Sequence, residues 1–189
     1  MPRKPHVSPS LGIRYYRVDF IYRQEDAAAQ MREVRARLKE LTALNRDVGI
    51  CGLLQNHSPD ANKTYFGGDL AELAGAVEGF APDQLGVAFD IAHALVVHGP
   101  AWRTYFEQLK PHFKIAYVKD VQLPRKWVPF GKGALAGSGY FELLHQMHYR
   151  APVSLHVEFD WTDQGKAKTR SGLVRALQDS GRVLRDWLG

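Results

Sequence analysis

The chain has 189 residues, of which 45% are hydrophobic and 24% charged, as is ordinary for one globular domain. Because its apolar runs are shorter than the roughly 18 residues of a membrane span, the composition argues against a membrane protein. The formal net charge is +5, but the basic residues are spread along the chain, so we expect a small anionic ligand rather than nucleic acid.

The N-terminal segment, residues 1–11, is basic, contains prolines and has little apolar content. No apolar stretch follows it, so it is predicted to be a tail rather than a signal peptide. Cys51 is the single cysteine, which rules out an intrachain disulfide. A reducing, cytoplasmic location is therefore predicted.

The first elements along the chain are predicted to be a strand, a helix and a second strand. Residues 12–22 (GIRYYRVDFIY) are rich in β-branched and aromatic side chains, which favours a strand. Asp26 is the predicted N-cap of a helix that reaches about Asn45, because apolar residues recur there at steps of three and four. Residues 48–54 (VGICGLL) are uniformly apolar, as is typical of a strand buried on both faces.

The same alternation continues to the C-terminus. Further strands are predicted at 85–90, 113–120 and 152–160. Further helices are predicted at 69–77, 102–109, 140–148 and 171–188. Five strands, each followed by a helix, indicate an α/β fold with a parallel sheet.

Polar side chains cluster where the predicted strands end. They are Gln55, Asn56, His57, Asp90, Lys119, Asp120, Glu158 and Asp160. Because the carboxyl ends of parallel strands meet at one edge of a sheet, these residues are predicted to form a site there. His112, His145, His148 and His156 lack the spacing of metal ligands, and we expect them to be structural or surface residues.

Five segments carry a family resemblance: LLQNHSPD, GVAFDIAH, AYVKD, VPFGKGAL and APVSLHVEFD. In this order and spacing they resemble the C-terminal part of a sugar-phosphate isomerase/epimerase of the xylose-isomerase-like TIM barrel superfamily. The resemblance implies that residues 12–189 form an incomplete (β/α)8 barrel of about five C-terminal β/α units. The first three units of the family pattern are absent, so either the chain is a fragment of a longer barrel, or another chain or self-association covers its two open sheet edges.

The resemblance also implies a site for one divalent metal ion, namely manganese, cobalt, magnesium or zinc. The four ligand positions fall on Gln55, Asp90, Tyr117 and Glu158. The first and last of these positions, Gln55 and Glu158, are those of the family's acid/base pair. His93 matches a histidine that contacts substrate.

Two ligand positions depart from the family's pattern. Gln55 stands where a glutamate is expected, and an amide cannot accept a proton as a carboxylate does. Tyr117 stands where a histidine is expected, and a phenol is a poorer cation ligand than an imidazole. The metal is therefore expected to be weakly bound or lost, with Asn56, His57 and His93 as substitutes.

Several of these residues have a structural alternative. Asp90 could be a metal ligand or the N-cap of a helix at IAHALVV. Lys119 could bind a substrate oxyanion or phosphate, or be a solvated lysine at the rim. Gly131 and Gly133 could bring backbone amides to a phosphate, but a tight turn is the favoured interpretation.

The favoured function is isomerisation or epimerisation of a sugar, keto-sugar or sugar phosphate by metal-assisted proton transfer next to a carbonyl. Glu158 would be the base and Asp90 a metal ligand, while His57, His93 and Lys119 would bind substrate oxygens. One rival is a carbohydrate-binding pseudoenzyme of the same fold that has lost its metal. Another is a metal-dependent endonuclease, which would need more histidines at strand ends than the sequence offers.

Overall fold

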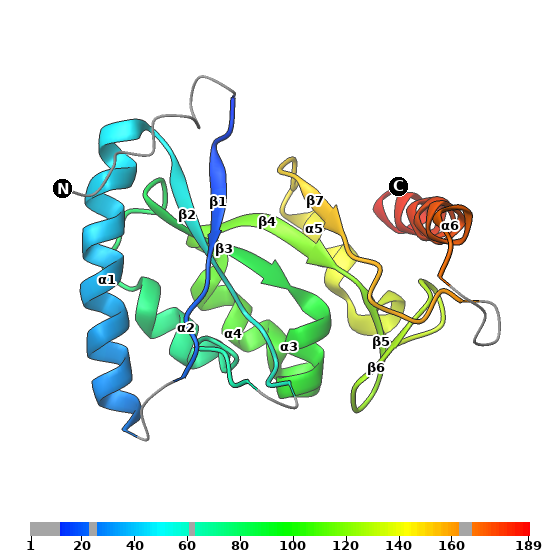
Figure 1. The fold of residues 1–189 in the computed structure, drawn as a ribbon, viewed down its shortest axis with the longest axis horizontal. Helices are drawn as coiled ribbons and strands as arrows, with labels where there is room; N and C mark the ends of the chain where they lie inside the picture. Colours follow the sequence, from blue (N-terminus) through cyan, green and yellow to red (C-terminus); the bar gives the residue numbers. More distant parts are fainter. Residues whose placement is uncertain (1–11, 23–25, 61–62, 163–167) are drawn as a thin grey trace.

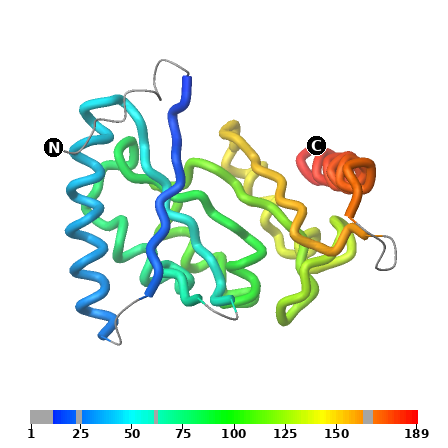
Figure 2. The backbone as a smooth tube through the Cα atoms, viewed as in Figure 1, coloured from blue at the N-terminus to red at the C-terminus, as the bar shows by residue number. Residues whose placement is uncertain are grey.

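A computed structural model describes residues 12–22, 26–60, 63–162 and 168–189, so the predicted tail at 1–11 lies outside the described residues. The described chain forms a sheet of five parallel strands in the order β1-β2-β3-β4-β7, with helices packed against it (Figure 1). This arrangement is a half-barrel and confirms the predicted partial (β/α)8 fold. Helices α1 and α6 lie at opposite ends of the molecule (Figure 2).

The elements follow the predicted alternation. The sheet strands are β1 (Tyr15–Val18), β2 (Cys51–Gln55), β3 (Leu85–Asp90), β4 (Phe113–Val118) and β7 (Val153–Leu155). The helices are α1 (Ala27–Val48), α2 (Leu70–Val77), α3 (Ile91–His98), α4 (Trp102–Leu109), α5 (Tyr140–Gln146) and α6 (Arg170–Leu188). Short 3-10 turns occupy Gly99–Ala101, Lys110–His112 and Ala136–Ser138.

The two faces of the sheet bury different residues. Leu54, Phe89 and Val118 belong to the main hydrophobic cluster, which the helices share. The alternate residues Leu53 and Ala88 belong to a separate small cluster on the other, concave face, together with Cys51. Because side chains alternate along a strand, the residues two positions beyond these on the concave face reach the C-terminal edge of the sheet. This parity places Gln55 and Asp90 on the concave face.

Three local features differ from the prediction. Helix α3 begins directly after β3, so Asp90 is its N-cap, as the structural alternative proposed. The strand predicted at 152–160 pairs only over Val153–Leu155, after which the chain runs on as an irregular segment. The loop after β4 contains an antiparallel hairpin of β5 (Asp120–Gln122) and β6 (Lys126–Val128), which was not predicted.

The sheet is open at both ends. In the described part of the chain, β1 pairs only with β2, and β7 only with β4. Unpaired strand edges favour association with another chain, so self-association stays a prediction. Among the described residues, no helix combines the length and apolarity needed to cross a membrane.

Asp120, which was predicted at the rim of the site, is instead a buried structural residue. Its carboxylate accepts hydrogen bonds from the backbone N–H groups of Val121, Gly131, Gly133 and Leu135, at 2.9 to 3.1 Å. The amides of both glycines are therefore used to hold the loop. This supports the turn interpretation of the GKG segment over phosphate binding.

The close approach of Gly133 to Asp120 gives a test of this loop. A Cβ atom at Gly133 would lie against the Asp120 carboxylate and 2.5 Å from the backbone oxygen of Val121. We expect Gly133→Ala to lower the free energy of unfolding by about 2 kcal/mol or more, measured by urea denaturation. Gly137→Ala is the matched control, because a Cβ there meets no atom within 4 Å. Equal stability of the two variants would contradict the tight packing of this loop.

Candidate active site

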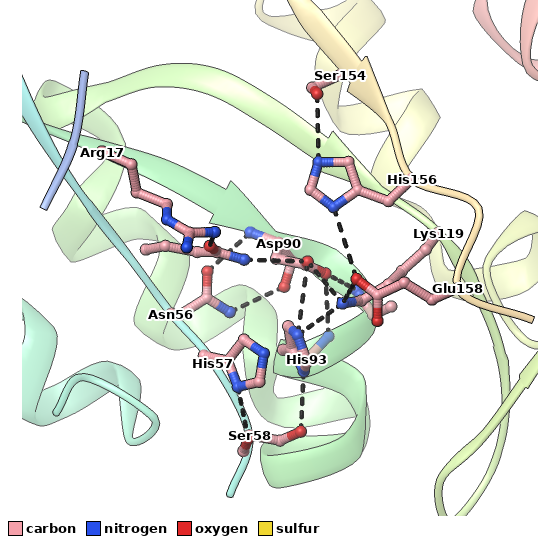
Figure 3. Close-up of polar contacts among 12 residues, drawn as sticks. Arg17, Asn56, His57, Ser58, Asp90, His93, Lys119, Ser154, His156 and Glu158 are labelled. Carbon is pink, nitrogen blue, oxygen red and sulfur yellow. Dashed lines mark hydrogen bonds and ion pairs between the residues drawn. The ribbon is translucent and has the colours of Figure 1, made fainter. Parts of the chain in front are cut away.

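Polar side chains from four strand ends meet at the carboxyl edge of the sheet (Figure 3). Gln55 ends β2, Asp90 ends β3, Lys119 follows β4, and Glu158 follows β7. This convergence is the one expected where parallel strands end at one edge of a sheet. The contacts within the cluster decide what chemistry it can perform.

Lys119 is the centre of the cluster and is only 1% exposed. Its Nζ lies 2.7 Å from Glu158 Oε1, 2.7 Å from His93 Nε2 and 3.3 Å from Asp90 Oδ2. The indole ring of Trp127, on the β5–β6 hairpin, lies 4.5 Å from the same nitrogen. An ammonium group has three N–H donors, and three acceptors surround this one. Lys119 is therefore not a solvated lysine at the rim.

His93 is a neutral imidazole with a defined tautomer. Burial, followed by the charge of Lys119, lowers its pKa strongly. Because an ammonium group only donates, His93 Nε2 accepts from Lys119 and Nδ1–H donates to Ser58 Oγ at 2.8 Å. The His93 ring also lies 3.8 Å from that of His57 and 5.2 Å from that of Trp127. His93 therefore positions Lys119.

Asp90 is fully buried. Its Oδ1 caps α3 by accepting from the backbone N–H groups of Ala92 and His93, and the side chain of Asn56 makes two hydrogen bonds to the backbone of Asp90. Burial raises the pKa of its carboxyl group, while the charge of Lys119 acts in the opposite direction. Asp90 is thus fixed by one oxygen, and its other oxygen, Oδ2, faces Lys119.

Gln55 uses both ends of its amide within the cluster. Its Nε2 donates to Asp90 Oδ2 at 3.4 Å, and its Oε1 accepts from Arg17 Nη1 at 3.0 Å. Arg17 in turn pairs with Asp19 at 2.7 Å. Gln55 is therefore a site-lining residue that contributes no proton acceptor.

Tyr117 lies on the concave face beside β7. Its ring is 4.5 Å from that of His156, and burial raises the pKa of its phenol. Within the described residues, no hydrogen bond or ion pair joins Tyr117 to Asp90 or Glu158. Tyr117 is the cross-strand neighbour of Asp90 and lines the concave face beside the charged cluster.

Glu158 is the accessible carboxylate of the cluster, with its side chain 39% exposed. Partial burial alone would raise its pKa, but the neighbouring His156 ring and the charge of Lys119 outweigh this and bring the pKa to about 2. His156 Nδ1 lies 3.8 Å from Glu158 Oε1, and Ser154 Oγ contacts the other ring nitrogen at 3.2 Å. His156, which was expected to be a structural or surface residue, thus contacts Glu158 in the candidate site.

His57 lies at the edge of the cluster. Burial lowers the pKa of its imidazole, and Nδ1 lies 2.7 Å from the backbone oxygen of Ser58, so this nitrogen is the N–H donor. Its ring lies between those of His93 and Tyr65, with ring centroids 3.8 and 4.2 Å away and the rings tilted to one another. Asp160 lies outside the cluster, where its carboxylate accepts from Thr162.

The donors of this cluster do not fit the divalent metal that the resemblance implied. Lys119 carries its positive charge between Asp90 and Glu158, and Gln55 turns its donor nitrogen, rather than its oxygen, toward Asp90. Across the described residues, no group of three or more histidine, cysteine, aspartate and glutamate side chains has an arrangement that could hold a metal ion. The side chains of the cluster themselves are therefore the groups to which chemistry at this site is assigned.

Sequence reasoning missed Arg17, Ser58, Trp127 and His156. Arg17 and His156 could have been found from strand parity, since each lies on the concave face near a strand end. Ser58 follows directly on the QNH segment and marks the end of a polar run. Trp127 reaches the site through the unpredicted hairpin, and the sequence carries no spacing signal for it.

Comparison with known proteins identifies the family. The model of the family described as xylose isomerase-like TIM barrel matches residues 6–179. The chain belongs to this family. No curated protein matches it significantly by sequence.

Solved xylose isomerase-like structures share the fold at low sequence identity. A D-tagatose 3-epimerase-like protein is 18% identical with a TM-score of 0.70, covering 94% of this chain and 63% of its own. D-psicose 3-epimerase from Clostridium cellulolyticum, solved with D-tagatose, is 14% identical with a TM-score of 0.71, covering 94% of this chain and 65% of its own. A xylose isomerase-like TIM barrel protein from Mycobacterium smegmatis, in complex with magnesium, is 14% identical with a TM-score of 0.65, covering 97% of this chain and 65% of its own. The chain thus spans 63 to 65% of the length of these structures.

Proposed function

We propose that this protein is a sugar isomerase or epimerase that moves a proton on the carbon next to the carbonyl of a sugar, keto-sugar or sugar phosphate. The family and the sugar epimerases among its structural neighbours support this substrate class. The observation that carries the proposal is the pair of Glu158 and Lys119, an accessible carboxylate bonded to a buried ammonium group at 2.7 Å. A proton acceptor beside a fixed cation is what enolisation of a carbonyl compound requires.

Glu158 and Lys119 would have separate roles. Glu158 would take the proton from carbon, while Lys119 would donate a hydrogen bond to the carbonyl oxygen as negative charge develops on it. The low pKa of Glu158 makes it a weak base while Lys119 is bonded to it. A substrate oxygen that draws the Lys119 hydrogen bond away would raise this pKa, so substrate binding itself would activate the base. His57 would contact substrate hydroxyl groups, whereas His93, whose two ring nitrogens are bonded to Lys119 and Ser58, would hold Lys119 in position.

The site supports isomerisation better than epimerisation. Epimerisation by proton transfer removes a proton on one face of the carbon and returns one on the other, which calls for a group that exchanges protons on each face. Gln55 occupies the position of the second acceptor and cannot fill that role. A single base can move a proton between neighbouring carbons on one face, as in aldose–ketose interconversion.

A carbohydrate-binding protein without catalysis is the second candidate. The observation that favours it is the amide of Gln55, which is held at both ends by Arg17 and Asp90 in the place of a catalytic base. Such a protein would use the polar side chains at this edge of the sheet to bind sugar hydroxyl groups. A cytoplasmic location and self-association are also part of the proposal.

Solvent deuterium exchange separates the two candidates. The chain is incubated in D2O, with EDTA, with a panel of ketoses, aldoses and their phosphates, and proton NMR follows the carbon next to the carbonyl. We expect deuterium at that carbon, above the enzyme-free rate, for at least one sugar. Saturable sugar binding, seen by saturation-transfer NMR without exchange, would favour the binding protein. Neither binding nor exchange would refute the proposal for this chain.

A further inference from the structure

We propose that Lys119 is the resident cation of this site and that its ammonium group takes the place of a divalent metal ion. The site would then be complete without metal. This inference does not depend on the proposed function, because it concerns what holds the buried carboxylates together. It would stand equally for an enzyme and for a binding protein.

The atoms around Lys119 Nζ are the kind that would otherwise bind a metal ion. Two carboxylate oxygens and one imidazole nitrogen, from Asp90, Glu158 and His93, are donors of the kind that bind divalent metals. All three are instead bonded to Lys119, at 2.7 to 3.3 Å, which are the distances of ammonium hydrogen bonds and ion pairs. The lysine thus occupies the position that faces all three donors, and it uses the single lone pair of His93 Nε2.

Trp127 contacts the ammonium group of Lys119 from a fourth side. The ring of Trp127 lies 4.5 Å from Nζ, where the face of an indole attracts a cation. Trp127 belongs to the β5–β6 hairpin, whose first residue, Asp120, is fixed by four backbone N–H groups. Among the described residues, the ammonium group thus contacts two carboxylates, one imidazole and one indole ring. Moving it away from these partners would cost free energy.

The charge balance at Asp90 also favours Lys119 over a metal ion. This fully buried carboxylate needs a positive partner. Gln55 is neutral, His93 is neutral, and Arg17 is paired with Asp19, so the cation that Asp90 contacts within the described residues is Lys119. A divalent ion on the same oxygens would lie next to the ammonium group, where repulsion between like charges in a buried site is strong. The two cations therefore exclude each other.

The test compares metal binding by the wild type and by Lys119→Met, which keeps the length of the side chain and removes its charge. We expect about 1 mM MnCl2 or EDTA to change the melting temperature of metal-free wild type by no more than about 2 °C. Lys119→Met should melt about 10 °C lower, because the buried carboxylates lose their partner. Manganese should restore much of this loss, and EDTA should abolish the recovery.

Lys110→Met is the matched control. Lys110 pairs with Glu107 at 3.3 Å on the surface, so its loss should leave both the melting temperature and the response to manganese unchanged. Saturable manganese binding by wild type with micromolar affinity in titration calorimetry would overturn the inference. So would a Lys119→Met variant that gains no response to manganese. If Lys119→Met does not fold, the wild-type titration and Lys119→Arg decide, since Lys119→Arg keeps the cation and should be as insensitive to metal as wild type.

Discussion

Replacing Glu158 by glutamine is expected to lower the rate of proton exchange on the substrate by about a thousandfold. An amide has nearly the shape of the carboxylate but cannot accept a proton from carbon. The side chain is 39% exposed, so the change leaves no buried cavity, and Lys119 keeps Asp90 and His93 as partners. The exchange rate in D2O and the thermal melt of the variant together check this expectation.

Asp160→Asn is the control for this experiment. Asp160 stands two residues further on in the same segment, and its carboxylate accepts from Thr162 outside the cluster. Its loss of charge should leave the exchange rate within a few-fold of wild type. If Glu158→Gln were as active as Asp160→Asn, Glu158 would not be the base.

Replacing Asp90 by alanine is expected to give the largest loss of stability, about 3 kcal/mol or more in the free energy of unfolding. The carboxylate pairs with the buried Lys119 at 3.3 Å and also caps α3. Removing it deprives the ammonium group of one of its two carboxylate partners and leaves two backbone N–H groups of the helix unsatisfied. Urea denaturation of wild type and variant measures the difference.

Asp26 offers a matched comparison for the capping part of this effect. It caps α1 in the same way, accepting from the backbone N–H groups of Ala28 and Ala29, but it is exposed and far from Lys119. Asp26→Ala should therefore cost only about 1 kcal/mol. A similar cost for the two variants would mean that the pair of Asp90 and Lys119 contributes little to folding.

The order of elements could be predicted from the sequence because its signals are local. The strand Leu85–Asp90 and the helix Trp102–Leu109 were predicted at their observed bounds, since an uninterrupted apolar run and a helical spacing are contained within each. The β5–β6 hairpin was not predicted. Its strands are three residues long, and it is held largely by Asp120, whose partners lie up to 15 residues further along the chain.

The site could be predicted in place but not in chemistry. Strand ends in a parallel sheet meet at one edge, so Asp90, Lys119 and Glu158 were expected together. Lys119 turns inward and binds both carboxylates, whereas Asp120 beside it holds the loop. These side-chain directions depend on tertiary packing, which the neighbouring residues in the sequence do not indicate. The same holds for Trp127, which reaches Lys119 only because the hairpin folds back.

The two hydrophobic clusters of the sheet bear on how this scaffold can diverge. Most buried apolar side chains lie between the sheet and its helices, whereas Cys51, Leu53 and Ala88 are the buried apolar side chains of the small cluster on the concave face among the described residues. Neutral substitutions on the concave face therefore remove little of the buried area on which folding depends. A chain can therefore carry glutamine instead of glutamate at residue 55, or tyrosine instead of histidine at residue 117, and still fold. The chemistry of the concave face can therefore change while the helix-covered face keeps the fold stable.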